Sequence, residues 1–386
     1  MIDMDNSATT RPDPEVVRVV TDVMKNVYGN PASLHGLGGK AERLVKQARE
    51  VIAKELGVSP ASMIFTSGGT ESNNMAIKGA AMQFRNRGRH LITTQVEHPS
   101  VFEVFKQLEA EGFRVTYLPV DQQGSVRLED VEAALCEDTI LVSIMHVNNE
   151  VGTIQPISEV GQLLRNYPKV LFHVDAVQSF GKMDVRPEEW GVDLLSISAH
   201  KLHGPRGVGC LYSREGVRLT PLLIGGGQES NQRSGTLNVP GIAGFAKATV
   251  LAANQRRGKW SQLQEWRREL IRRCTESLTH FRINGDPSDG GAPFILSLSF
   301  PGLKSEVIVH ALEEEEIIVS SKSACSSKGE KASRILTAMG IDEATAVGTI
   351  RISMSRMTSV KDVEATASAL QQIIPKLQKI MKVHEV

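Results

Sequence analysis

The chain has 386 residues, with 44 Lys and Arg against 44 Asp and Glu, and 41% of the residues are hydrophobic. At roughly 150 residues per domain, this length predicts two or three domains, or one large domain with an appendage. The balanced charge argues against a protein that coats nucleic acid or an anionic membrane. No apolar run approaches the roughly 20 residues that cross a bilayer, so we expect no membrane partner.

The four cysteines, Cys136, Cys210, Cys274 and Cys325, are widely spaced and form no CxxC pair. This spacing excludes a zinc ribbon and disfavours a disulfide framework, and we expect no metal site. The first three lie in apolar or helical contexts, which predicts buried and inert thiols. The start of the chain, MIDMDNSATT, lacks the features of a signal peptide. We therefore expect a soluble protein in a reducing compartment, the cytoplasm.

Short apolar runs alternate with amphipathic stretches in the first two thirds of the chain. The runs expected to form strands are Met63–Phe65, Leu91–Thr93, Val115–Leu118, Ile140–Met145, Val170–Val174, Leu194–Ile197 and Val208–Tyr212. The helices expected between them are Glu71–Arg85, Ser100–Glu111, Leu128–Leu135 and Ile157–Arg165. This alternation predicts a mostly parallel, doubly wound α/β sheet, with ligands beyond the carboxyl ends of its strands.

The pattern changes after the glycines at 225–227, where we expect a smaller α+β domain. Gly241–Leu278 predicts a long helix or a helix pair. After it we expect two strands, Phe294–Phe300 and Ile317–Ser320, and two further helices, Lys304–Glu313 and Val360–Lys382. We expect three parts. Residues 1–20 form an N-terminal segment packed on the small domain, residues 21–255 form a large cofactor-binding domain, and residues 256–386 form the small C-terminal domain.

The first candidate site is a Gly-rich turn, Thr66–Thr70, between an expected strand and an expected helix. Free backbone N–H groups and the positive end of a helix dipole favour an anion at such a junction, and phosphate is the natural ligand. A tight turn capped by Thr70 is the alternative. The turn does not match the Walker A pattern.

Two charged residues, Asp175 and Lys201, follow apolar runs. Asp175 is expected either to hold a protonated ring nitrogen or to cap a helix, since a bare buried carboxylate is costly. Lys201, preceded by His200, is expected either to react with a carbonyl or to extend to solvent. A phosphate turn, an aspartate and a lysine, in this order, are what pyridoxal 5'-phosphate requires.

Eleven short motifs carry a more specific resemblance along nearly the whole chain. They are Asp5–Thr10, Gly29–Pro31, Thr66–Glu71, Glu97–His98, Val147–Gly152, His173–Gln178, Ser198–Lys201, Gln228–Glu229, Arg233–Thr236, Ser323–Ser326 and Arg351–Ser353. In sequence and order, they resemble the motifs of the NifS/IscS-like cysteine desulfurases of the class V aminotransferase group. That resemblance implies the PLP fold-type I architecture, a large domain with a mostly parallel sheet plus a smaller α+β domain.

The resemblance also implies how the cofactor would be held. Lys201 would bind pyridoxal phosphate as a Schiff base, and Asp175 would pair with the pyridine nitrogen. His98 would stack on the ring and transfer a proton to or from the substrate. Four residues would bind the phosphate group: Gly69, Thr70, Ser198 and His200.

Further roles concern the substrate and a second subunit. Thr236 would reach the phosphate from the other subunit of a homodimer. Asn149 and Gln178 would contact the phenolic oxygen of the ring or its surroundings. Arg351, with Asn30, would bind the substrate carboxylate, a role that suits a planar guanidinium.

Cys325 lies in Ser320–Gly329, where no other side chain is both apolar and larger than alanine. Such a composition predicts an exposed, mobile loop. Lys322 and Lys328 flank the thiol and would favour the nucleophilic thiolate. An incidental surface cysteine is the alternative from composition alone. The resemblance implies that Cys325 takes the sulfur of L-cysteine as a persulfide.

The expected function is that of a PLP-dependent L-cysteine desulfurase, which forms L-alanine and passes sulfur to an acceptor protein. The acceptor is expected to be either an iron–sulfur scaffold or a ThiI-type tRNA thiolation enzyme. Both stay open because Gly329–Ser333 departs from the Leu-Glu-Pro-Ser type of segment in many relatives, so the surface that docks the acceptor can differ too. The charged set Lys328, Glu330 and Lys331 resembles a branch that serves tRNA thiolation. The alternatives are a selenocysteine lyase, another small-amino-acid lyase or aminotransferase, and a non-catalytic sulfur-relay scaffold. No direct nucleic-acid partner is expected.

Overall fold

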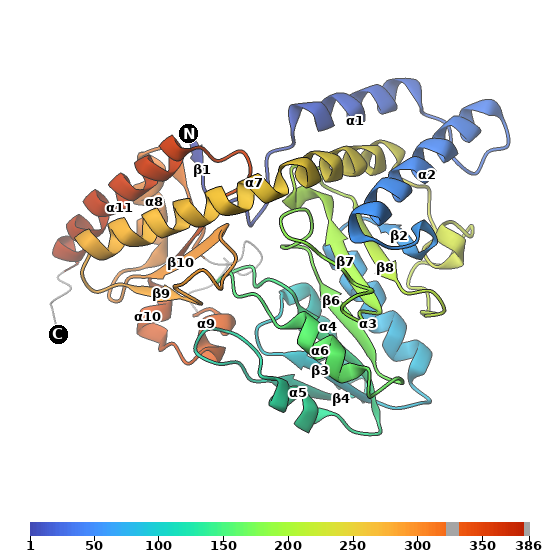
Figure 1. Ribbon diagram of the computed structural model, residues 1–386, viewed down its shortest axis with the longest axis horizontal. Coiled ribbons are helices and arrows are strands. Elements are labelled where there is room, and N and C mark those ends of the chain that lie inside the picture. The colour runs from blue at the N-terminus through green and yellow to red at the C-terminus, as the bar shows by residue number, and fades with distance from the viewer. Residues whose placement is uncertain (322–331, 382–386) are drawn as a thin grey trace.

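The computed structural model describes residues 1–321 and 332–381. A large α/β part and a smaller α+β part are spanned by one long helix (Figure 1). The main sheet has seven strands in the order β2-β8-β7-β6-β5-β3-β4. Their bounds are β2 (Met63–Thr66), β3 (His90–Thr94), β4 (Arg114–Leu118), β5 (Thr139–Met145), β6 (Leu171–Asp175), β7 (Leu194–Ser198) and β8 (Gly209–Ser213).

Pairing in this sheet is parallel from β4 to β7, and β8 runs antiparallel to both of its neighbours, β2 and β7. The connecting helices are α3 (Gly69–Phe84), α4 (Pro99–Ala110), α5 (Leu128–Ala134) and α6 (Ile157–Leu164). Strands β5, β6 and β7 are buried along their whole length, as expected when helices cover both faces. Within β6, Leu171 packs into one core, whereas Phe172 and Val174 pack into another. The predicted mostly parallel, doubly wound sheet is confirmed.

Two helices that the sequence did not predict, α1 (Pro14–Asn26) and α2 (Gly36–Leu56), pack on α7 (Val239–Ser277). Asp13 caps α1 by accepting a hydrogen bond from the backbone N–H of Glu15. Helix α7 is continuous over 39 residues, which resolves the choice between one helix and two. The expected domain limit at 255 falls inside this helix, and the domain limits stay a prediction.

The smaller part is built on a three-stranded sheet in the order β12-β10-β9. Its elements are β9 (Arg282–Asn284), β10 (Ile295–Ser299), α8 (Ser305–Glu314), α9 (Arg334–Ala338), α10 (Glu343–Val347), β12 (Thr349–Ser353) and α11 (Val360–Ile380). Strand β1 (Ile2–Asp3) pairs in parallel with β11 (Ile317–Ile318). This pairing brings the start of the chain next to β12, where Asn6 Nδ2 donates to the carbonyl of Ser353 over 3.0 Å.

The three described cysteines do not all behave as predicted. Cys210 and Cys274 are buried, but Cys136 is exposed, so the prediction for Cys136 was wrong. Its apolar neighbours belong to two different elements, α5 and β5, and Cys136 lies in the turn between them. Arg114 Nη2 lies 3.1 Å from its sulfur. Among the described residues, no helix combines the length and apolar character needed to span a membrane.

Candidate active site

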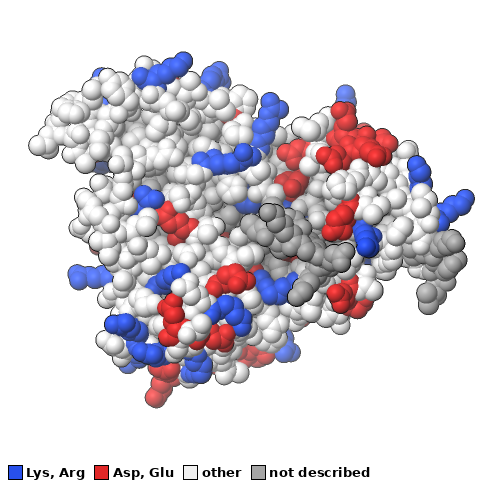
Figure 2. Space-filling model, turned by 180° about the vertical axis from the view of Figure 1, so that it is seen from behind, with Lys and Arg blue, Asp and Glu red and all other residues white. Residues whose placement is uncertain are grey.

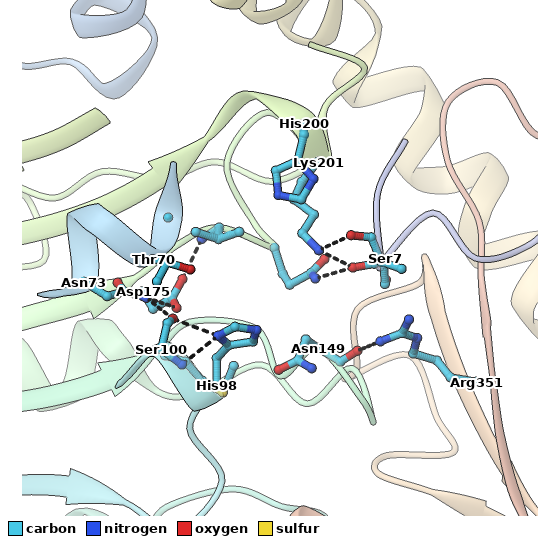
Figure 3. A pocket seen from close by; sticks show the side chains of 15 residues that line it. Ser7, Thr70, Asn73, His98, Ser100, Asn149, Asp175, His200, Lys201 and Arg351 are labelled. Carbon is cyan, nitrogen blue, oxygen red and sulfur yellow. Dashed lines mark hydrogen bonds between the residues drawn. The ribbon is translucent and has the colours of Figure 1, made fainter. Parts of the chain in front are cut away.

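A cavity of about 270 Å³ lies beyond the carboxyl ends of β5, β6 and β7 (Figure 3). Such a position is typical of ligand sites in doubly wound sheets. Most of the predicted site residues line it: Gly69, Thr70, His98, Asn149, Asp175, Gln178, His200, Lys201 and Arg351. Their motifs are far apart in sequence, and the fold brings them together at one edge of the sheet.

Lys201 ends the short 3-10 helix η2 (Ala199–Lys201), which follows β7 directly. Its Nζ donates to the carbonyl oxygens of Ser7 and Ala8, over 2.5 and 2.8 Å. The N-terminal segment is itself held in place, because Thr10 Oγ1 donates to the carbonyl of His200 over 2.8 Å. Ser7 and Ala8 could not be recognised from the sequence, because they contribute backbone atoms and not reactive side chains. The lysine amine therefore points into the cavity and not to solvent.

Asp175 is the last residue of β6, and both of its carboxylate oxygens accept hydrogen bonds. Asn73 Nδ2 donates to Oδ2 over 2.8 Å, and the backbone N–H of Val177 donates to Oδ1 over 3.0 Å. Asn73 also donates to Ser100 Oγ over 2.9 Å. Sequence reasoning missed Asn73 and Ser100, which carry no charge. The contacts fix the carboxylate at the floor of the cavity.

His98 is the N-cap of α4, and its Nδ1 accepts a hydrogen bond from the backbone N–H of Ser100 over 3.1 Å. In the neutral ring the hydrogen must then be on Nε2. Burial lowers the pKa of His98, with Lys201 and Arg334 adding to the effect and Asp175 opposing it. The imidazole is therefore neutral at neutral pH and available to exchange a proton.

The residues predicted to bind an anion lie at the start of α3. Its N-cap is Gly68, without a side-chain hydrogen bond, so the alternative in which Thr70 caps the helix is wrong. A Cβ on Gly69 would lie 2.6 Å from Val177 Cγ2, so a glycine is needed for this approach. A second cavity, of about 350 Å³, is lined by all four predicted phosphate ligands: Gly69, Thr70, Ser198 and His200.

Ser198 gives independent support for a ligand at this place. Its Oγ is buried and has no hydrogen-bond partner among the described residues. A buried hydroxyl without a partner is costly, and an incoming acceptor would satisfy it. Nearby, burial lowers the pKa of His200 to about 3, with the charge of Lys201 adding to the effect. Because His200 is neutral, it can lie in the phosphate cavity without a carboxylate beside it.

Arg351 lies in the middle of β12 and is buried. Its Nη1 donates to the carbonyl of Asn149 over 2.8 Å, and its Nη2 lies 2.7 Å from Oδ1 of Asp5. These contacts hold the guanidinium at the cavity and leave further N–H groups for a carboxylate. The side chain thus reaches from the smaller part of the molecule to the sheet of the larger part.

Two of the predicted residues that the structure describes lie outside both cavities. Asn30 and Thr236 are exposed and line neither cavity. Asn30 Oδ1 accepts a hydrogen bond from the backbone N–H of Ala32 over 3.0 Å. Cys325, with the flanking residues Lys322 and Lys328, lies outside the described residues. The roles expected for these residues stay predictions.

The donor set of the site fits pyridoxal phosphate. An amine, a fixed carboxylate and a helix N-terminus with a free hydroxyl correspond to the aldehyde, the ring nitrogen and the phosphate of that cofactor. In residues 1–321 and 332–381, no cluster of metal-ligating side chains accompanies them.

Comparisons with known proteins agree with this geometry. Residues 2–366 match the aminotransferase class-V family. The chain is 44% identical over 377 residues to "Cysteine desulfurase IscS" of Dictyoglomus turgidum, covering 98% of this chain and 95% of the relative. A solved structure of a "NIFS-LIKE PROTEIN" superposes with a TM-score of 0.91 at 40% identity, covering 97% of this chain and 100% of that one.

A second solved structure, "SspA in complex with cysteine", superposes with a TM-score of 0.81 at 34% identity. It covers 93% of this chain and 100% of the other. With its motifs, its fold and the placement of its site all in agreement, the chain belongs to the class V aminotransferase family, within the group of IscS/NifS-like cysteine desulfurases.

Proposed function

We propose that this protein is a PLP-dependent L-cysteine desulfurase, which converts L-cysteine to L-alanine and keeps the sulfur as a persulfide on Cys325. The observation that carries the proposal is that the amine of Lys201, the carboxylate of Asp175 and the guanidinium of Arg351 line one cavity. Family membership supports the same activity, and the relative solved with cysteine supports the choice of substrate.

The cofactor would be held at three points. Lys201 would hold it covalently, and Asp175 would keep its ring nitrogen protonated. Gly69 and Ser198 would hold its phosphate at the start of α3. When bound, pyridoxal phosphate supplies an electron sink for charge that develops at the substrate α-carbon.

The substrate would be oriented and deprotonated by residues of this cavity. Arg351, held by Asp5 and the carbonyl of Asn149, would bind the carboxylate of L-cysteine. The amine of Lys201 would take the α-proton. His98, with its hydrogen on Nε2, would exchange a proton with the substrate at the opposite side of the cavity, where Figure 3 shows its ring.

Sulfur would then move to the Cys325 thiolate. Its sulfur attacks the sulfur of the substrate, the S–S bond forms as the C–S bond breaks, and protonation of the carbon fragment gives alanine. The described neighbours of Cys325 support this role. Ser320 pairs with Arg351 through two backbone hydrogen bonds, and Ser333 Oγ donates to Glu150 Oε2 over 2.5 Å. Ser321 and Ser333, which flank the cysteine segment, line one small cavity together with Arg351.

A homodimer would complete the site with Thr236. Leu223 and Ile224, in the chain segment before this residue, have exposed apolar side chains. The backbone N–H of Ser234 donates to the carbonyl of Leu223. This hydrogen bond connects the exposed segment to the loop that carries Thr236. A second subunit covering these side chains would bury apolar surface and bring Thr236 to the partner's phosphate site.

The persulfide would pass to a protein acceptor in the cytoplasm, either an iron–sulfur scaffold or a ThiI-type enzyme. On the face seen in Figure 2, basic and acidic side chains are interspersed, with one acidic gathering at the upper right. Together with the zero net charge, this favours a protein acceptor over direct contact with nucleic acid. A sulfur-relay assay with both acceptors distinguishes them, and transfer to the scaffold alone would refute the ThiI-type acceptor.

The absorption spectrum of the purified protein, before and after addition of L-cysteine, tests the function. We expect a visible cofactor band that changes with L-cysteine and is absent in Lys201→Ala, with Lys78→Ala as the control. An unchanged spectrum in Lys201→Ala would refute the cofactor assignment. Turnover of L-selenocysteine but not of L-cysteine would identify a selenocysteine lyase instead.

A further inference from the structure

Lys201 lines the cavity of about 270 Å³ described above, here called the cofactor cavity. It also lines a smaller cavity of about 40 Å³. That volume holds at most a few water molecules. Its lining combines aromatic rings with cationic side chains, among them Phe294, Trp260 and Lys182. Lys182 has no part in the mechanism described above, although its neighbours do.

Lys182 is connected to Lys201 through a short chain of hydrogen bonds. Its Nζ donates to Gln178 Oε1 over 3.3 Å, and Gln178 Nε2 donates to the carbonyl of Ser7 over 3.0 Å. The same carbonyl accepts from Lys201 Nζ over 2.5 Å. The amine of Lys182 also lies 4.5 Å from the centroid of the Phe294 ring. Gln178, which lies between the two lysines in this chain of contacts, also lines the cofactor cavity.

The charges around Lys182 are mostly positive. Burial lowers the pKa of Lys182 to about 7, and the charges of Lys201 and Arg351 add to the effect. The other titratable side chains of the smaller cavity are His203, Arg256, Lys259 and Arg356. Burial lowers the pKa of His203 to about 4, with the charges of Arg356 and Lys182 adding to the effect and Asp13 opposing it.

Nearby acidic side chains have partners of their own. Asp13 pairs with Arg356, Arg256 pairs with Glu55 and Asp184, and Asp5 pairs with Arg351. In the part of the chain that the structure describes, Lys182 has no ion pair with a carboxylate. A proton on Lys182 therefore adds a positive charge close enough to interact with Lys201.

We propose that Lys182 is a positioning residue that orients the amide of Gln178 and, when protonated, disfavours a proton on the nitrogen of Lys201. The inference rests on the proposed function, in which that nitrogen holds the cofactor and takes the substrate α-proton. A base must be unprotonated to accept a proton, so a nearby positive charge keeps Lys201 in its active form at neutral pH.

The test is a pH titration of the visible cofactor band, without substrate. Lys182→Met removes the charge, so the pKa of the Lys201 nitrogen is expected to rise by about one unit. Lys182→Gln, which keeps a neutral donor, is expected to raise it similarly, whereas Lys182→Arg keeps the charge and the wild-type midpoint. Lys169→Met, at an exposed position on the same part of the molecule, is the control and is expected to change nothing.

The outcomes separate the two proposals. No visible band in the wild-type protein would overturn the proposed function and, with it, the role of Lys182. A wild-type band whose midpoint is the same in Lys182→Met and Lys182→Gln would overturn the role of Lys182 alone. An equal rise in Lys182→Arg would also overturn it, because a structural defect and not charge would then be the cause. If Lys182→Met does not fold, Lys182→Gln gives the same reading.

Discussion

Asn73 donates a hydrogen bond to Oδ2 of Asp175 over 2.8 Å and thereby joins helix α3 to the carboxyl end of β6. The same amide nitrogen reaches Ser100, which in turn contacts His98 Nδ1 over 2.8 Å. One neutral side chain thus connects the carboxylate expected at the ring nitrogen with the imidazole expected at the ring face.

Asn73→Ala is expected to weaken cofactor binding about tenfold, since a hydrogen bond to a charged group contributes roughly 1.5 kcal/mol or more. The cofactor dissociation constant, measured from the visible band, checks this. Asn74→Ala is the matched control, because its side chain bonds only the carbonyl of Thr70 among the described contacts. Equal affinities of Asn73→Ala and the wild type would mean that Asp175 is held without Asn73.

Arg351→Lys is expected to raise KM for L-cysteine roughly tenfold to a hundredfold, because a lysine cannot bind a carboxylate in the bidentate way. The visible band should stay unchanged, since the guanidinium is assigned to the substrate and not to the cofactor. Steady-state kinetics check this, with the exposed Arg268→Lys as the control. A lower kcat with an unchanged KM would contradict the assignment.

Cys325→Ala is expected to keep the cofactor band and to lose persulfide formation from L-cysteine. The exposed thiol of Cys136 offers a control, because Thr139 and Arg114 lower its pKa against the opposing effect of burial. Cys136→Ala should form the persulfide like the wild type. Labelling of persulfides after reaction with L-cysteine distinguishes the two, and full sulfur release by Cys325→Ala would refute its role as nucleophile.

Glu97→Gln is expected to stabilise the protein more at pH 8 than at pH 5. Burial raises the pKa of Glu97 to about 8, although Met145 and Thr94 donate hydrogen bonds to its Oε1. Because the folded-state pKa lies above the ordinary value of 4.5, the stability contributed by this group is full below that value. It is lost as pH rises through 8, and a neutral amide removes this loss.

Urea unfolding of the wild type and Glu97→Gln at both pH values measures the effect. The exposed Glu111→Gln is the control, for which no such difference is expected. A stability difference between wild type and Glu97→Gln that does not change between pH 5 and pH 8 would show that Glu97 is ionised in the folded protein throughout.

The main sheet could be predicted from sequence because its strands are nearly continuous apolar runs. The predicted run Ile140–Met145 is one residue shorter than β5, and the predicted run Leu194–Ile197 is one residue shorter than β7. Helix α2 was missed because it begins with Gly36, Gly38 and Gly39, which disfavour a helix, and because small residues make up much of its buried face. Tertiary packing against α7 overcomes this weak local preference.

Some residues of the candidate site could likewise be predicted from the sequence, and others could not. Residues whose chemistry is distinctive, such as Lys201 and Asp175, could be selected from their position after apolar runs. Asn73 and Ser100 could not, since only the packing of α3 against α4 brings two neutral side chains together. The contact of Ser7 with Lys201 involves a backbone carbonyl and therefore leaves no side-chain signal in the sequence.

A single-turnover reaction shows whether sulfur passes from L-cysteine to Cys325. The purified protein is mixed with L-cysteine in the absence of acceptor, alanine is quantified, and the Cys325 peptide is examined by mass spectrometry. We expect one alanine for each Cys325 that gains the mass of one sulfur atom. Alanine formed while Cys325 remains unmodified, or no alanine at all from protein that carries the cofactor, would contradict it.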